Sequence, residues 1–192
     1  MSSRKNLLAL AVLAYLSQAP MHPYELSKTL RAHGDDRSIK FTHGSVYMVV
    51  EQLLKAGLIA EQETTRDGQR PERTVYGITP DGRAELRDWL RDLVGTPRHE
   101  FPAFGSALSL VSALHPDVVV ELLQQRLVRL EEQRAEAAEL AAGATPHPLF
   151  LVEEAYRQGL LEAEIAFVRR FVEQITDPVD GWGPMWAAYH ET

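Results

Sequence analysis

The chain of 192 residues contains no cysteine, which excludes disulfide bonds and thiolate metal ligands. It also lacks an apolar run of the roughly 20 residues that a transmembrane helix needs. A chain of this length can bury one good core or two small ones without such supports. The first apolar run, residues 7–16, leads into Ser17 and Gln18 without a small-residue cleavage site, which favours an internal core helix over a signal peptide. We therefore expect a cytoplasmic protein.

Motifs for catalysis and cofactor binding are missing as well. The sequence has neither a GxGxxG nor a P-loop motif, and Ser45 follows Gly44 without the second glycine of a nucleophile elbow. Its seven histidines are scattered, and no His-x-x-x-His pair indicates a metal site. Neighbouring carboxylates such as Glu153 and Glu154 have no apolar cleft in the sequence to raise a pKa. We expect a protein that is not an enzyme and that needs no cofactor and no metal.

Negative charge is distributed unevenly along the chain, whose formal net charge is −7. Residues 1–95 contain 13 basic and 12 acidic residues, whereas residues 96–192 contain 7 basic and 15 acidic residues. Charges separated by more than about 10 Å are screened at ordinary salt, so affinity for a polyanion depends on the local patch. The first half can therefore bind a polyanion although the whole chain is acidic.

Residues 40–79 have the order of elements that a winged helix-turn-helix requires. Apolar side chains with a period of 3.6 residues predict one buried helical stripe, made of Val46, Val49, Val50, Leu53 and Leu54. Gly57 suits the end of that helix, and an extended run follows to Thr65. Asp67-Gly68 predicts a tight hairpin, which carries three arginines and returns as a second strand over residues 74–79. Taken alone, the hairpin could equally be a charged surface turn that binds nothing.

The chain breaks between Gly95 and Pro102, where we expect a domain boundary. Thr79-Pro80-Asp81 predicts the helix before this break, with a hydroxyl N-cap and a proline at the first helical position. The predicted fold class is mainly α with a small β-hairpin. It combines a winged helix-turn-helix domain over residues 1–95 with an all-helical dimerisation domain and C-terminal tail over residues 96–192.

The second half is expected to form a short helix over residues 104–114, a long helix from His115 to about Ala142, and a final helix over residues 149–175. The final helix carries two apolar stripes. One contains Val152, Tyr156, Gly159, Ala163, Phe167 and Phe171, and the other contains Leu161, Ile165, Val168, Val172 and Ile175. Two apolar faces need two partners, and a second copy of the chain is the most economical second partner. We assign the homodimer interface to Leu161, Ile165, Val168 and Val172; a central helix of a monomeric bundle is the alternative.

Several segments of residues 7–95 resemble the PadR-type transcriptional regulators. They are the first helix over residues 7–16, His22-Pro23-Tyr24-Glu25-Leu26, Gly44-Ser45-Val46-Tyr47, Leu53 with Ala56-Gly57-Leu58-Ile59, the hairpin residues Pro71, Arg73 and Tyr76, and Thr79-Pro80-Asp81-Gly82. The resemblance implies a dimeric winged helix that binds double-stranded operator DNA, usually as a repressor, and that is released by a small molecule or another signal. Four residues depart from the family pattern: Pro23 replaces a glycine, Met48 stands where proline is usual, and Glu51 and Gln52 occupy positions that are often basic.

The resemblance also carries DNA contact onto Ser45 and Tyr47 in the third helix and onto Arg73 in the hairpin. Placement alone adds Thr42, His43, Met48, Arg66 and Arg70 to the expected DNA-binding residues. The head of the helix would enter the major groove, and the hairpin would follow the backbone. The alternative is a winged-helix adaptor without operator binding, which the acidic Glu51 in the same helix favours.

Aromatic residues near the expected boundary and in the tail indicate a site for a small planar effector. We single out Trp89, Phe104 and Trp186, with Phe101, Trp182 and Tyr189 nearby in the sequence. The alternative is that these side chains anchor the tail onto the core or onto the second copy of the chain.

Overall fold

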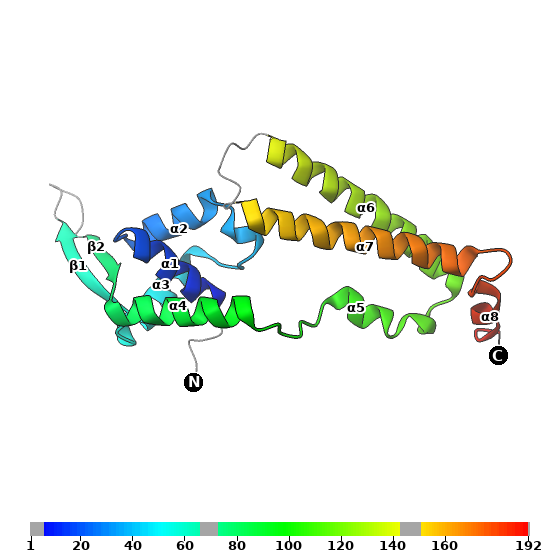
Figure 1. The fold of residues 1–192 in the computed structure, drawn as a ribbon, viewed down its shortest axis with the longest axis horizontal. Helices are drawn as coiled ribbons and strands as arrows, with labels where there is room; N and C mark the ends of the chain where they lie inside the picture. The colour runs from blue at the N-terminus through cyan, green and yellow to red at the C-terminus, as the bar shows by residue number, and fades with distance from the viewer. Residues whose placement is uncertain (1–5, 66–72, 143–150, 192) are drawn as a thin grey trace. The chain divides into compact units, whose positions relative to one another are not determined.

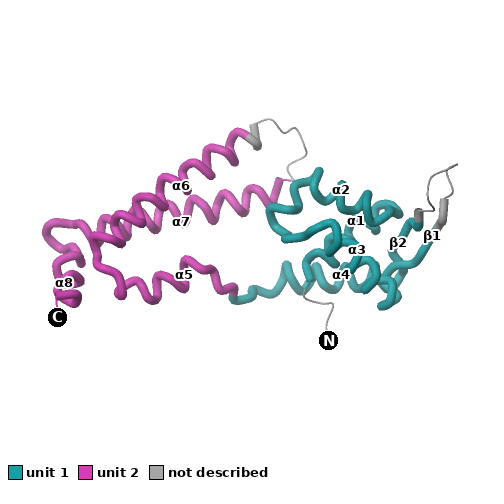
Figure 2. Tube along the Cα trace, turned by 180° about the vertical axis from the view of Figure 1, so that it is seen from behind, with its two compact units in different colours: residues 1–99 teal, residues 100–192 magenta. Residues whose placement is uncertain are grey.

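The computed structural model of the chain describes residues 6–65, 73–142 and 151–191 and divides into two compact units, Met1–His99 and Glu100–Thr192 (Figure 2). It is mainly helical and contains one two-stranded antiparallel sheet, which confirms the predicted fold class (Figure 1). Within the described residues, no helix is both long and apolar enough to cross a membrane.

The first unit has the element order of a winged helix-turn-helix. Its elements are α1 (Leu7–Gln18), α2 (Pro23–Ala32), the 3₁₀ turn η2 (Asp35–Arg37), α3 (His43–Lys55), β1 (Ile59–Thr65), β2 (Arg73–Ile78) and α4 (Pro80–Gly95). The strands pair from Ile59 opposite Ile78 to Thr65 opposite Arg73. Met21, between α1 and α2, bridges to Tyr76 and so ties the helices to the sheet.

Helix α1 lies at the centre of the first core. Six of its twelve residues are buried, on more than one face of the helix: Leu8, Ala9, Ala11, Val12, Leu13 and Leu16. The stripe predicted for α3 meets them, because Val46, Val49, Val50 and Leu53 are each at most 2% exposed. Burial of one apolar face supplies most of the stability of such a helix. The buried stripe leaves the opposite face of α3 free for solvent.

Helix α4 is fixed against the end of α3 by two features of its first turn. Thr79 is the expected N-cap: its hydroxyl oxygen accepts from the Gly82 N–H at 3.1 Å, and its hydroxyl donates to the Gly57 carbonyl oxygen at 2.8 Å. Gly82 itself is buried, and a Cβ at this position would come 2.0 Å from the Leu58 carbonyl oxygen. The close approach requires glycine.

The second unit contains α5 (Ala103–Leu108), the 3₁₀ turn η3 (Val111–Ala113), α6 (Pro116–Ala142), α7 (Val152–Thr176) and α8 (Gly183–Ala188). Helices α6 and α7 run side by side (Figure 1). The helix expected over residues 104–114 is shorter than predicted, because the chain turns at Ser109 and Leu110 before η3. The Ser109 hydroxyl donates to the Ser106 carbonyl oxygen at 2.7 Å, a local bond that competes with the continuing helix.

The stripe of α7 that we assigned to the dimer interface packs instead against α6 of the same protomer. Ile165 is 3% and Val168 0% exposed, and both pack in the protomer's own core with Val119, Leu123 and Leu130 of α6. Leu161 and Val172 lie partly buried at the edge of this core. We predicted that Ile165 and Val168 face a second copy of the chain. Within one protomer both side chains are already covered by α6, which argues against that prediction. Val152, Tyr156 and Phe167 of the other stripe stay exposed, as does the neighbouring Leu160, whereas Phe171 of that stripe is buried in the core.

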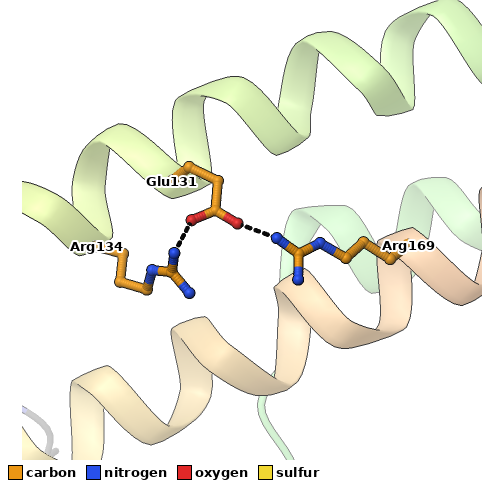
Figure 3. Close-up of polar contacts among 3 residues, drawn as sticks. All are labelled: Glu131, Arg134 and Arg169. Carbon is orange, nitrogen blue, oxygen red and sulfur yellow. Dashed lines mark hydrogen bonds and ion pairs between the residues drawn. The ribbon is translucent and has the colours of Figure 1, made fainter.

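Ion pairs cross between α6 and α7 beside this core. Glu131 of α6 contacts both Arg134 of its own helix and Arg169 of α7 (Figure 3). Arg126 of α6 pairs with Glu164 of α7, with Arg126 Nη2 2.5 Å from Glu164 Oε1. Glu131 therefore joins the two helices.

Candidate nucleic-acid interface

The head of α3 is held by a capping box made of two residues that we expected to contact DNA. Thr42 Oγ1 accepts a hydrogen bond from the Ser45 N–H at 3.2 Å, and Ser45 Oγ accepts one from the Thr42 N–H at 2.8 Å. The Ser45 hydroxyl also donates to the Thr42 carbonyl oxygen at 2.8 Å. Because these bonds satisfy the first turn of the helix, both hydroxyls are largely engaged before DNA arrives.

His43, the first residue of α3, is held by a buried hydroxyl on α2. Its Nδ1 lies 2.8 Å from Ser27 Oγ, and Ser27 is only 2% exposed. The imidazole itself is exposed. A buried polar group needs a hydrogen-bond partner, so α2 and α3 are joined by a specific contact at the point where α3 begins.

Two tyrosines pack around the His43 ring. Tyr24 approaches it edge-on with ring centroids 5.4 Å apart, and Tyr47 does so at 5.6 Å. Tyr47 also contacts the ring of His22, the N-cap of α2, at 6.2 Å. Tyr24 and Tyr47 remain 52% and 39% exposed, so these rings form an aromatic surface beside the head of α3. Sequence reasoning missed Ser27 and Tyr24 as members of this surface, although Tyr24 lies in a segment that carried the family resemblance.

Met48 and Glu51 also lie on the exposed face of α3. Met48 is 60% exposed, and Glu51 is also exposed. Burial raises the pKa of the Tyr76 hydroxyl on β2 above its usual value, and the carboxylates of Glu61 and Glu51 raise that pKa further. The Glu51 carboxylate thus acts on the sheet, and it lies about two helical turns along α3 from His43.

The hairpin carries the other expected DNA contacts. Arg66 and Arg70 fall outside the described residues. Arg73 is the first residue of β2, and it pairs with Thr65 at the end of the sheet that adjoins residues 66–72.

An apolar groove of about 450 Å³ lies within the second unit. It is lined by uncharged residues from α5 to η3, α7 and the α8 region: Leu108, Val111, Ser112, Phe167, Phe171, Gln174, Trp182, Met185, Trp186 and Tyr189. Of the three residues singled out for an effector site, Trp186 lines this groove. Phe104 packs at the edge of the same core and stacks under Arg126, whereas Trp89 is 8% exposed in the core of the first unit.

Among the described residues, no group of three or more acidic, histidine or cysteine side chains is arranged to hold a metal ion. The first unit exposes the head of α3 and the aromatic surface beside it. This arrangement can offer hydrogen-bond donors and acceptors to a groove of about the width of a helix.

Comparison with known proteins also indicates a transcriptional regulator. Residues 12–88 match the model of the transcriptional regulator PadR-like family. The negative transcriptional regulator PadR of Bacillus subtilis is 27% identical over 146 residues, which cover 73% of this chain and 79% of that protein. The probable transcriptional regulator Rv1176c of Mycobacterium tuberculosis is 30% identical over 116 residues, which cover 58% of this chain and 56% of that protein.

Solved structures share the fold. The crystal structure of Bacillus subtilis PadR in complex with operator DNA has a TM-score of 0.69 at 18% identity, covering 86% of this chain and 97% of that chain. The crystal structure of the same protein with p-coumaric acid has a TM-score of 0.66 at 17% identity, covering 88% of this chain and 94% of that chain. Through residues 12–88, the chain belongs to the transcriptional regulator PadR-like family.

Proposed function

We propose that this protein is a sequence-specific operator-binding repressor that acts as a homodimer and is released by a small molecule. The observation that carries the proposal is the head of α3, where His43, Tyr47 and Met48 are exposed on a helix whose other face is fully buried. In a winged helix-turn-helix this end of the third helix enters the major groove. The relative solved with operator DNA has the same fold, which supports this use of the surface.

Within this proposal, Thr42 and Ser45 position the helix, and His43, Tyr47 and Met48 face the bases. Arg66, Arg70 and Arg73 supply the basic hairpin that contacts phosphates, since arginine is well suited to phosphate oxygens. The first domain extends over about residues 1–95 and the helical dimerisation domain over residues 96–192. The protein would work in the cytoplasm, where its DNA is, and its function requires no catalysis.

The dimer needs an exposed apolar face, and α7 offers one. Val152, Tyr156, Leu160 and Phe167 are between 38% and 69% exposed and recur at helical spacing. A contiguous apolar stripe of this kind marks an interaction surface. We assign the two-fold contact to these exposed residues in place of Leu161, Ile165, Val168 and Val172, which pack in or against the protomer's own core.

The test is binding of the purified protein to the DNA that adjoins its own gene, measured by gel shift at several salt concentrations. Operator binding predicts a specific shift whose log affinity falls linearly with log salt, because phosphate contacts release counterions. A scrambled fragment of equal length serves as the control. Absence of a shift, or equal affinity for the scrambled fragment, would contradict the proposal and favour an adaptor role.

A further inference from the structure

Ser27 stands out as a buried hydroxyl that contacts a side chain on the proposed DNA-binding surface. It is 2% exposed, and among the described residues its side chain makes one hydrogen bond, to His43 Nδ1 at 2.8 Å. A buried hydroxyl proton that finds no acceptor is costly. The Ser27 O–H therefore donates to His43 Nδ1, since that nitrogen is its acceptor.

This direction of donation fixes the tautomer of His43. A neutral imidazole has one protonated nitrogen, so an accepting Nδ1 requires the proton on Nε2. Nε2 lies on the other side of the ring from Nδ1 and so is directed away from the buried Ser27. Within the described part of the chain it has no hydrogen-bond partner.

The ring that carries this N–H is also restrained laterally. Tyr24 from α2 and Tyr47 from α3 contact it edge-on at 5.4 Å and 5.6 Å between centroids. A donor that is held in direction and in protonation state before binding loses little freedom when it binds. His43 thus offers a preoriented donor at the first position of α3.

A lone donor in the major groove discriminates among bases. N7 is the acceptor that both purines share; guanine adds O6 and thymine presents O4, whereas cytosine presents only an N4 donor, which would oppose another donor. We propose that Ser27 holds His43 as the Nε2–H tautomer and that His43 thereby selects a purine N7 at one position of each operator half-site. This inference rests on the proposed function, because it requires that α3 enters the major groove.

The tautomer can be measured on the free full-length protein by long-range ¹H–¹⁵N correlation at pH 8.5, with His43→Gln to assign its signals. We expect an unprotonated Nδ1 and a protonated Nε2 in His43. His33 is an internal reference for the opposite tautomer, because its Nδ1 lies 2.9 Å from the Thr29 carbonyl oxygen and must donate. Ser27→Ala should move the His43 signals toward a mixture of both forms. A protonated Nδ1 in wild-type His43 overturns the inference, and this measurement requires no variant of Ser27.

The contact between His43 and a purine N7, which we call base reading, is tested on an operator selected from random DNA. Each purine of this operator is replaced singly by its 7-deaza analogue. We expect one position per half-site at which the analogue weakens wild-type binding about tenfold, the equivalent of one hydrogen bond of about 1.4 kcal/mol. The same replacement should have no effect on His43→Ala and a reduced effect on Ser27→Ala.

Two outcomes would overturn base reading without touching the proposed function. One is a His43→Ala variant that weakens all sequences equally while no 7-deaza position responds, which indicates a phosphate contact. The other is a response that persists in His43→Ala, which assigns the N7 to another side chain. If the protein selects no DNA at all, the proposed function fails together with base reading, while the tautomer measurement still decides the role of Ser27.

Discussion

Arg126 of α6 donates from Nε to Glu164 Oε1 of α7 at 2.6 Å. Its guanidinium carbon also lies 3.7 Å from the centroid of the Phe104 ring of α5. One side chain therefore joins three helices of the second unit. The pair is about one-third exposed, so solvent weakens its charge interaction.

Arg126→Ala should lower the free energy of unfolding by about 1 kcal/mol, because it removes a partly screened ion pair and a cation–π contact. Urea unfolding measures the change. A double-mutant cycle with Glu164→Ala should give a coupling of about 0.5 kcal/mol. Arg129→Ala on the exposed side of the same helix is the matched control and should change stability little. Equal losses for Arg126→Ala and Arg129→Ala would show that the three-helix contact contributes nothing.

Leu160→Glu should produce monomers while the protomer keeps its fold. Leu160 is 54% exposed in the protomer, so a carboxylate there is solvated in the monomer but unpaired in an apolar interface. Sedimentation gives the mass, and thermal melting gives the fold.

The matched variant is Ile165→Glu, which buries a charge inside the protomer and should lower the melting temperature sharply. Operator affinity should fall for Leu160→Glu, because one monomer reaches one half-site. A dimeric Leu160→Glu protein would refute the assignment of the two-fold contact to the exposed stripe.

Gly82→Ala should destabilise the first unit by about 2–4 kcal/mol, in the range of severe overpacking. The added Cβ would meet the Leu58 carbonyl oxygen at 2.0 Å and Ile78 Cγ1 at 2.8 Å. Gly95→Ala is the control on the same helix, because a Cβ there meets nothing within 4 Å. Denaturation followed by circular dichroism compares the two variants. Similar stabilities would mean that α4 can shift away from Leu58 at little cost.

Local patterns in the sequence predicted most elements because each depends on neighbours in the chain. The stripe from Val46 to Leu53 needs only the helical period, and the start of α4 needs only the Thr79 hydroxyl beside Pro80. The candidate site could be predicted only in part. The sequence predicted the head of α3 as the contact surface, but it did not predict the hydrogen bond between Ser27 and His43. That contact joins residues 16 positions apart on two helices, and a serine inside a helix gives no signal of such a partner.

The inward face of α7 could not be predicted, because both of its stripes are apolar. The choice is made by the side chains that α6 and α8 bring to it, among them Val119 and Trp186. The sequence left two roles open for Trp186, in a ligand site or as an anchor of the C-terminal tail. It is 7% exposed in the second core and also lines the apolar groove.

Arg73→Ala should weaken operator binding about equally for all sequences and flatten the salt slope by about one unit, as expected for the loss of one phosphate contact. Fluorescence anisotropy at four salt concentrations measures both quantities. Met48→Ala should instead change which bases are preferred at unchanged slope, since its thioether carries no charge. Wild-type affinity and slope in Arg73→Ala would remove the hairpin from the interface.

The apolar groove in the second unit should bind neutral planar aromatic compounds better than anionic ones. None of its lining residues is charged, so a carboxylate would lose its hydration there without gaining a cationic partner. Methyl p-coumarate should therefore quench tryptophan fluorescence at a lower concentration than p-coumarate, and the quenching should saturate.

Trp182→Phe and Trp186→Phe locate the quenching in this groove, because Trp89 lies in the core of the other unit. Met185→Glu places a charge on the lining at a side chain that is 63% exposed, so it should abolish ester binding without unfolding the protein. Quenching that is unchanged in Met185→Glu, or that is stronger with the free acid, would place the effector elsewhere. Loss of operator binding on addition of the ester, in the wild type but not in Met185→Glu, would connect the groove to release from DNA.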